Sequence, residues 1–379
     1  MSTRFRTLSR VPVAPVRQRA AARVLVVSGS VGAGHDGAAN ELAARLRAAD
    51  VEVDVRDLLS VLPQPVPKVL REGYCLTVDR APLVFERLFT ALERSGLARR
   101  AMLEVCRSGE RGVGRWLAEG DYSAAVSTYP LASQVLGQLR RRGLAPMPLV
   151  TYLTDPAAHR SWIHSDIDVH LTVTAATAER GAAAYGIPMT AAGPLVPSRF
   201  AVPVPPRRVR ELRTELGLPE GRPVALLVAG SLGLGDVVSS TEHVIAAGLV
   251  PVVLCGRNER VRGQVAAVRG AVALGWRDDV HELMAVADVL VHNAGGLSFT
   301  EALVAGLPAV SYRCIPGHGQ ANAAVLQEGG IAPWAHSPAE LAAALHSQLA
   351  VGRRPACLAD PAQVVLALLP ARQQLAASA

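Results

Sequence analysis

Short apolar runs alternate with segments of helical periodicity along most of the chain. The run Arg23-Val-Leu-Val-Val-Ser28 is rich in β-branched residues and ends at glycines, which is typical of a buried parallel strand. A helical pattern follows over residues 37–49, and residues 51–55 form a second strand pattern. This order predicts a βαβ unit at the start of a parallel sheet.

The same alternation continues through both halves of the chain. Further strands are predicted at residues 124–127, 149–153 and 170–173, and then at 223–229, 250–254, 287–291 and 309–312. Proline-rich residues 194–208 lie between the two sets and are typical of a linker. We therefore predict an α/β protein made of two Rossmann-like doubly wound domains that face a cleft. The expected boundaries are 1–20 for an unstructured basic arm, 21–195 for the N-terminal domain, 196–208 for the linker, 209–360 for the C-terminal domain and 361–379 for a final helix and tail.

Composition narrows the classes of protein that fit this pattern. Half of the residues are hydrophobic, yet no apolar run reaches the roughly 18–20 residues of a membrane span, and the N-terminus has no secretory signal. We therefore expect a cytoplasmic protein. Its five cysteines are scattered, which favours free thiols over a metal site or disulfides.

The net charge of +7 is concentrated in the N-terminal half. Five arginines and no acidic residue lie in residues 1–20, and a second basic concentration runs over residues 68–115. Such charge attracts nucleic acid or anionic lipid, or forms a solvated face. Aromatic residues, which stack on bases, make up only 4% of the chain, so we expect no nucleic-acid partner.

The first glycine-rich loop contains the most ambiguous motif. Its glycines Gly32-x-Gly34-x-x-Gly37 match the dinucleotide-binding fingerprint, and Asp54 lies near the offset expected for a ribose-binding acid. A Walker A loop is excluded, because histidine and aspartate stand where that motif has lysine and a hydroxyl residue. His35, at the start of a helix that faces the cleft, has the chemistry of a general base near neutral pH.

A second candidate site lies directly after the predicted strand at residues 149–153. Asp155 there is placed to orient His35 or a substrate hydroxyl, since α/β proteins carry their chemistry at the carboxyl ends of strands. The alternative is a turn aspartate before a proline. His159 and Trp162 follow on the same loop as further candidates.

The second half opens with another strand and glycine-rich loop. Gly230 and Ser231 begin this loop, whose glycines would let backbone N–H groups approach a phosphate or a sugar. The alternative is a tight strand-to-helix turn. Asn258 follows the next predicted strand and is expected to project into the same cleft.

The stretch from Asn293 to Glu301 carries the strongest signal. It follows a predicted strand and opens a helix, so its glycines expose a helix N-terminus whose free N–H groups and dipole favour phosphate. The residues expected to contact a ligand there are Gly295, Gly296, Leu297 and Ser298.

Polar side chains near this stretch suit a sugar nucleotide. Glu301 is one helical turn after Ser298, where its carboxylate can accept both hydroxyls of a ribose or can complete a capping box. Further along the chain, Gln320 and Asn322 offer neutral amides that suit sugar hydroxyls.

Taken together, these motifs resemble the MurG-like glycosyltransferases with the GT-B fold. The nearer branch is that of monogalactosyldiacylglycerol synthase and the bacterial diacylglycerol glycosyltransferases. The resemblance covers residues 22–335 and is specific in the order and spacing of its motifs. The motifs that carry it are Gly32 to Ala39, Thr154-Asp155 with His159 and Trp162, Cys255 to Asn258, Gly275-Trp276, Asn293 to Glu301, and Pro316 to Asn322.

The resemblance implies an inverting transfer of a hexose from a UDP-sugar to a lipid such as diacylglycerol, with neither a metal nor a cofactor. His35 would deprotonate the acceptor hydroxyl, and Glu301 would hold the ribose. The N-terminal domain would bind the acceptor, through Gly34, His159 and Trp162. The C-terminal domain would bind the donor, through Gly230, Ser231, Asn258, Trp276, Gly295, Gly296, Leu297, Ser298, Glu301, Gln320 and Asn322.

Relatives also contact the membrane through a segment that residues 66–97 resemble. Phe85, Leu88, Phe89 and Leu92 follow the spacing of one helical face there, which suits either a membrane interface or the protein core. We therefore expect peripheral contact with an anionic membrane, at the inner face of the plasma membrane.

Two parts of this interpretation stay open. The loop Pro-Gly-His-Gly-Gln at residues 316–320 differs from the more acidic Pro-Gly-Gln-Glu of lipid galactosyltransferases, so the sugar is not fixed. The rival functions are an NAD(P)-dependent oxidoreductase that uses the fingerprint at residues 32–37, a sugar-nucleotide epimerase, and a sugar-nucleotide-binding protein without activity.

Overall fold

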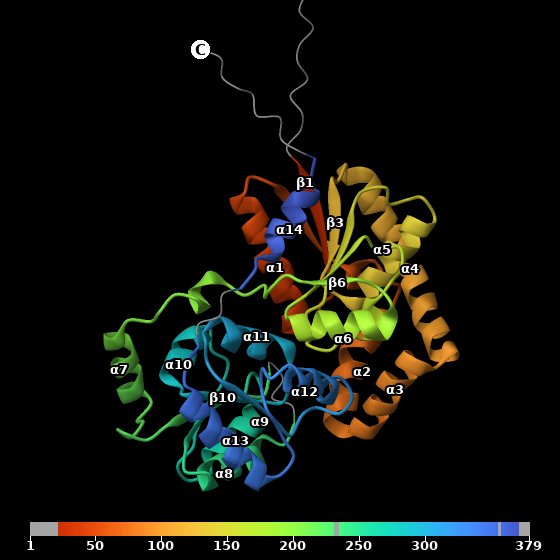
Figure 1. Cartoon of the computed structure of the whole chain (residues 1–379). Helices are drawn as coiled ribbons and strands as arrows, with labels where there is room; N and C mark the ends of the chain where they lie inside the picture. The colour runs from red at the N-terminus through yellow and green to blue at the C-terminus, as the bar shows by residue number, and fades with distance from the viewer. Residues whose placement is uncertain (1–21, 231–234, 355–357, 371–379) are drawn as a thin grey trace, which may run out of the picture.

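The structure is a computed structural model that describes residues 22–230, 235–354 and 358–370, apart from the side chains of residues 74, 75, 78–80 and 82. The basic arm predicted at residues 1–20 lies outside these ranges. Two parallel sheets of six strands each form the framework, and helices cover both faces of each sheet (Figure 1). The predicted α/β fold with two doubly wound units is therefore confirmed.

The first sheet has the strand order β2-β1-β3-β4-β5-β6. Its strands are β1 (Arg23–Ser28), β2 (Glu52–Asp57), β3 (Ala124–Ser127), β4 (Leu149–Tyr152), β5 (Val169–Thr172) and β6 (Met189–Ala191). Its helices are α1 (Ala33–Ala48), α2 (Val66–Arg80), α3 (Pro82–Arg94), α4 (Gly96–Gly120), α5 (Pro130–Arg141) and α6 (Ala175–Tyr185), with short 3₁₀ turns η1 (Leu58–Val61) and η2 (Arg160–Trp162).

The second sheet has the strand order β12-β11-β10-β7-β8-β9. Its strands are β7 (Val224–Val228), β8 (Val250–Leu254), β9 (Val272–Leu274), β10 (Val289–His292), β11 (Ala309–Tyr312) and β12 (Trp334–Ala335). Its helices are α7 (Pro206–Glu215), α8 (Val237–Ala246), α9 (Glu259–Ala266), α10 (Val280–Val286), α11 (Gly296–Val304), α12 (His318–Glu328) and α13 (Pro338–Val351).

Helix α1 begins four residues earlier than the sequence pattern predicts, at Ala33 instead of residue 37. Glycine lowers helix propensity, so Gly34 and Gly37 conceal this first turn from a reading by pattern. In the structure both glycines face α11, and a Cβ on either would lie 3.8 or 3.9 Å from the Leu297 side chain. Packing against the other half of the molecule therefore supports a turn that propensity does not favour.

The chain crosses between the two halves twice. The first crossing is the proline-rich segment predicted as a linker. Its first part is packed, because Leu195, Val196 and Phe200 are buried and residues Ser198–Phe200 form the 3₁₀ turn η3, whereas residues 201–203 and 205–207 are exposed. In the second crossing, the final helix α14 (Pro361–Leu368) returns to the first half and packs beside α1 (Figure 1).

The segment α2–α3 divides its apolar side chains between two faces. Phe85 and Phe89 of α3 point inward, where their ring centroids lie 5.5 and 6.5 Å from that of His318 on α12. Leu88, by contrast, is half exposed. The single predicted apolar face is therefore split, with part of it directed to the protein and part to solvent. Among the described helices, none is long and apolar enough to cross a membrane.

Candidate functional site

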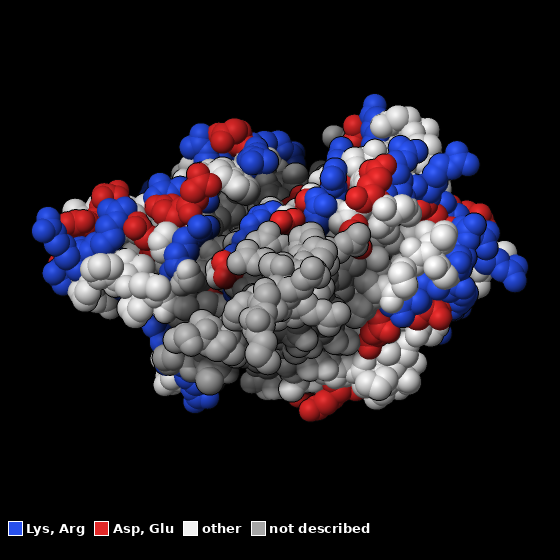
Figure 2. Space-filling model, turned by 90° about the horizontal axis from the view of Figure 1, so that it is seen from above, with Lys and Arg blue, Asp and Glu red and all other residues white. Residues whose placement is uncertain are grey.

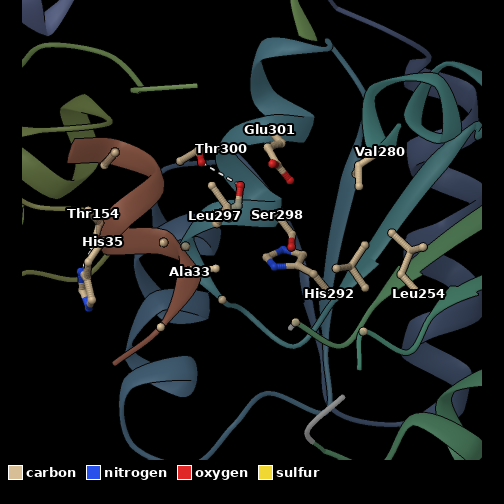
Figure 3. Close-up of a pocket in the computed structure, with 18 of the residues that line it drawn as sticks. Ala33, His35, Thr154, Leu254, Val280, His292, Leu297, Ser298, Thr300 and Glu301 are labelled. Carbon is tan, nitrogen blue, oxygen red and sulfur yellow. Dashed lines mark hydrogen bonds between the residues drawn. The ribbon is translucent and has the colours of Figure 1, made fainter. Parts of the chain in front are cut away.

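A cavity of about 460 Å³ lies between the two sheets, at the carboxyl ends of their strands. In the first sheet, the order reverses at β1 and β3, and in the second sheet it reverses at β7 and β10. Ligands of open parallel sheets bind at such reversal points. Here both points open onto the same cavity, so residues that are far apart in the sequence meet there (Figure 3).

His35 lines the first-half side of this cavity, near the start of α1. Its Nδ1 atom is 3.0 Å from the carbonyl oxygen of Thr128 and 3.1 Å from the hydroxyl of Thr154. A carbonyl oxygen only accepts hydrogen bonds, so Nδ1 carries the proton and Nε2 is left as an acceptor. Burial lowers the pKa of His35, and the nearby charge of Asp155 partly opposes that shift. The imidazole is therefore neutral near pH 7 and has the form required of a general base.

Asp155 faces the cavity from the loop after β4. Its Oδ2 atom accepts a hydrogen bond of 3.2 Å from the indole of Trp162, which fixes the carboxylate. Trp162 itself is buried, and its ring centroid is 5.7 Å from that of His35. The structure thus gives Trp162 a supporting position beneath both candidate residues, outside the cavity lining.

The N-terminus of α11 forms the opposite wall. Gly295 caps the helix with an extended backbone, and Gly295, Gly296, Leu297 and Ser298 all line the cavity. The turn before the helix is held by His292, whose Nδ1 accepts a hydrogen bond of 3.2 Å from the N–H of Ala294. The first N–H groups of this helix therefore face the cavity, as an anion site requires.

Gly296 also packs closely against the first half. A Cβ atom at this position would lie 2.5 Å from the carbonyl oxygen of Thr154, which no side chain tolerates. Only glycine therefore allows α11 to meet the loop that carries Asp155. Figure 3 shows His35 on α1 and Ser298 on α11, with Leu297 between them.

Glu301 lines the cavity one turn further along α11. The alternative role as a capping-box partner of Ser298 does not occur, because the helix begins at Gly296 and its cap is Gly295. Burial raises the pKa of Glu301 to about 7, and the charge of Arg199 opposes that shift. Glu301 thus lines the cavity, and its carboxyl group is close to its titration point at neutral pH.

Of the other residues predicted to bind the donor, some line the cavity and others do not. Gly230 and Trp276 line the cavity, and the guanidinium carbon of Arg257 lies 4.4 Å from the centre of the Trp276 ring. Ser231 lies outside the described residues. Asn258 caps α9 instead, by accepting a hydrogen bond of 3.1 Å from the N–H of Val261.

Asn322 and His159 also have supporting positions. The Asn322 amide is buried, accepts from the N–H of Ala157 at 2.8 Å and donates to the carbonyl of Ala294 at 2.9 Å, so it ties the two halves together. His159 is buried as well, and its ring stacks on Phe89 with centroids 4.2 Å apart. Gln320 lies on α12, outside the cavity lining. Ligand contact by these residues, and by Asn258 and Trp162, stays a prediction that the geometry does not support.

Arg199 and His318 are charged or titratable lining residues that the sequence reasoning did not select. Arg199 stands in the segment treated as a linker, and His318 stands in the loop whose amides drew attention instead. Burial lowers the pKa of His318, and the charge of Asp155 opposes that shift. His318 lines the same cavity as His35 and Asp155. No periodicity marks either residue: Arg199 lies on the 3₁₀ turn η3, and His318 is the first residue of α12.

The dinucleotide-binding alternative does not fit this geometry. Gly34 lines the cavity, as predicted for a ligand contact, but Gly34 and Gly37 pack against Leu297 of α11, which occupies the space that a pyrophosphate would need. Asp54, the presumed ribose acid, accepts a hydrogen bond of 2.8 Å from Arg23 and another from the hydroxyl of Tyr122. Its carboxylate is occupied within the first half, and Asp54 does not line the cavity.

Solved structures with the same architecture define the class. The chain superposes on MurG of Acinetobacter baumannii with a TM-score of 0.58 and 16% identity, covering 92% of this chain and 99% of that one. It superposes on the Streptomyces sp. SF2575 glycosyltransferase SsfS6, in complex with thymidine diphosphate, with a TM-score of 0.54 and 15% identity, covering 92% and 99%. The fold is that of the GT-B glycosyltransferases.

Sequence comparisons narrow the class to one branch. Residues 35–193 match the family model of monogalactosyldiacylglycerol (MGDG) synthase. The chloroplastic MGDG synthase of Spinacia oleracea is 28% identical over 362 residues, which cover 88% of this chain and 67% of that protein. The processive diacylglycerol beta-glucosyltransferase of Bacillus subtilis (strain 168) is 24% identical over 322 residues, covering 82% of each chain. The chain is thus a glycosyltransferase similar to the MGDG synthase branch, and the predicted resemblance is confirmed.

Proposed function

We propose that the protein transfers a hexose from a UDP-sugar to a hydroxyl group of diacylglycerol or a related lipid, with inversion at the anomeric carbon. The observation that carries the proposal is the placement of a neutral histidine, His35, across one cavity from the N-terminus of α11 and Glu301. The names of the spinach and Bacillus relatives support a hexose as the group transferred and diacylglycerol as the acceptor.

In the proposed reaction, Nε2 of His35 takes the proton of the acceptor hydroxyl. The acceptor oxygen forms a bond to the anomeric carbon while the bond from that carbon to the diphosphate oxygen breaks. The negative charge that develops on the leaving UDP is stabilised by the N–H groups at the start of α11, which are already oriented before the reaction. Asp155, held by Trp162, stabilises the imidazolium that forms. These residues account for the transfer without a metal or a cofactor.

The acceptor is proposed to arrive from a membrane surface at the α2–α3–α4 segment. The described chain exposes ten large hydrophobic side chains, and six of them lie here: Val69, Leu76, Leu83, Val84, Leu88 and Leu97. Lys68, Arg71, Arg87 and Arg94 are exposed among them. In Figure 2, Lys and Arg side chains gather on the right, the side where Figure 1 places α3, α4 and α5. Apolar side chains ringed by cations suit an anionic membrane interface on the cytoplasmic side.

The test of the proposed function is a transfer assay with purified protein. UDP-glucose and UDP-galactose are each supplied with vesicles that contain diacylglycerol, and the anomeric configuration of any glycolipid is determined by NMR spectroscopy. We expect a β-linked product from an α-linked donor. Retention of configuration would contradict the proposal. Turnover of the donor without an acceptor would favour an epimerase, and UDP binding without turnover on any acceptor would favour a binding protein.

Replacing Leu88 by aspartate is expected to weaken binding to vesicles of phosphatidylglycerol and phosphatidylcholine about tenfold, because it places a charge in the apolar interface. Sedimentation with the vesicles measures the effect. The matched control is Val351→Asp, since Val351 is similarly exposed but lies at the end of α13 in the second half. Equal losses in both variants, or none in either, would mean that the α3 face does not contact the membrane.

A further inference from the structure

One cation at the cavity has no place in the transfer step. Arg199 lies on η3, in the first crossing between the two sheets, and it lines the cavity that Glu301 also lines. Its guanidinium carbon lies 5.6 Å from the ring centroid of Phe200, which is buried. The arginine is therefore carried by a packed segment, although its own side chain is exposed.

Glu301 lines the same cavity as this cation, and its carboxyl group feels the charge of Arg199. Helix α11 packs against η3, and among the described residues no hydrogen bond or ion pair reaches the Glu301 carboxyl group. A carboxyl group that is taken out of water without partners tends to become neutral. A neutral carboxyl group accepts hydrogen bonds poorly, and two ribose hydroxyls need a group that accepts from both.

We propose that Arg199 is a positioning residue of the donor site, and that its charge favours the ionised form of the Glu301 carboxyl group, which accepts hydrogen bonds from the ribose of the sugar nucleotide. The inference rests on the proposed function, because it takes a ribonucleotide as the ligand of Glu301. It adds a residue from the connection between the domains to the donor site.

The surrounding charges leave Arg199 as the cation that acts on this carboxylate. Burial raises the pKa of Glu301 to about 7, and Arg199 is the group that lowers it. Arg277 also lines the cavity, but its Nε and one terminal nitrogen donate to Asp279, which pairs its charge. The histidine beneath the site, His292, is neutral because burial lowers its pKa to about 4. The remaining titratable groups that line the cavity are His35, Tyr152, Asp155, Asp278 and His318.

The sign of the pH dependence follows from these groups. The carboxylate form of Glu301 binds the ribose, so affinity for UDP is full above the pKa of Glu301 and is lost as the pH falls through it. Removing the charge of Arg199 raises that pKa. The Arg199→Ala variant is therefore expected to lose affinity at a higher pH than the wild type, with a several-fold weaker Kd near neutral pH and little difference at alkaline pH.

The experiment is calorimetric titration of the full-length protein with UDP across pH about 6 to 9. Glu301→Gln cannot titrate, so its profile gives the contribution of the UDP phosphates alone. Arg199→Lys should keep the wild-type midpoint, because it retains the charge. The matched control Arg210→Ala removes an exposed arginine of α7 and should also keep that midpoint. With 2′-deoxy-UDP, the difference between wild type and Arg199→Ala should shrink.

Several results would overturn the inference. If Arg199→Ala weakens UDP by the same factor at every pH, the arginine acts on the phosphates and not through Glu301. If the variant binds UDP like the wild type throughout, Arg199 has no part in the donor site. Failure of the proposed function is distinguishable, because in that case the wild-type protein itself binds no UDP or transfers no sugar.

Discussion

Alanine in place of His35 is expected to lower kcat for sugar transfer about 10²- to 10⁴-fold, the usual contribution of a general base. UDP should bind as it does to the wild type, because the histidine lies across the cavity from the N-terminus of α11. Initial rates at saturating donor measure the loss, and calorimetry with UDP measures the binding. His336→Ala is the matched control, since His336 is exposed and its ring packs at a tilt against Trp334, outside the cavity lining.

The pH profile of kcat gives a second readout of the same residue. Neutral imidazole is the active form, so activity falls as the pH drops through the pKa of His35 in the donor complex. Burial lowers that pKa from its ordinary value, which keeps the enzyme active at lower pH than an exposed histidine would allow. Asp155→Asn removes a charge that raises the pKa, so the acid limb should move further down. A variant at position 35 that retains the wild-type kcat would show that another group takes the proton.

A single methyl group at position 296 is expected to cost about 100-fold in kcat/KM, which is the scale on which a small misplacement of reacting groups acts. The added Cβ would lie 2.5 Å from the carbonyl oxygen of Thr154, and this backbone atom cannot move away as a flexible side chain can. Gly296→Ala should therefore hold the two halves apart and separate His35 from the donor. Steady-state kinetics with the UDP-sugar measure the effect.

The same variant should remain folded. Position 296 is the first residue of α11, where alanine is a good helix former, and opening of the cleft relieves the clash. Gly263→Ala is the matched control, because it adds the same methyl group to α9 with no atom within 4 Å. Neither variant should unfold at a lower urea midpoint than the wild type, and Gly263→Ala should unfold at a slightly higher one, because alanine favours a helix interior over glycine. Wild-type activity in Gly296→Ala would mean that the close approach at Thr154 is not needed for transfer.

The sequence predicted those parts of the fold that follow from local pattern. The buried strands appear as apolar runs, and the strands at residues 124–127, 250–254 and 309–312 match β3, β8 and β11. The boundary of α1 was missed because glycines conceal a turn that only packing against α11 explains.

Prediction of the candidate site succeeded and failed for related reasons. His35 and Glu301 are recognisable because each lies next to a glycine-rich turn after a strand, and such turns have a known place in parallel sheets. The sequence around Asn322 also predicted a ligand contact, yet both ends of its amide form hydrogen bonds to backbone groups, one in each half of the protein. Arg199 could not be selected, because a single arginine in a proline-rich segment does not indicate whether its side chain will lie at the cavity.

The return of α14 to the first half restricts how the enzyme can open. A protein with one connection between its halves can twist and bend in any direction, whereas two connections leave mainly the rotation about the line that joins them. The helix is fastened to the first half by Ala362 and Val365, which are buried, and by the 2.9 Å ion pair between Arg45 and Asp360. Substrate entry and product release would then follow one hinge rotation of the two halves about the line that joins the two connections. Arg199 lies on the first connection, near this line, and Gly296 lies where the two halves come into contact.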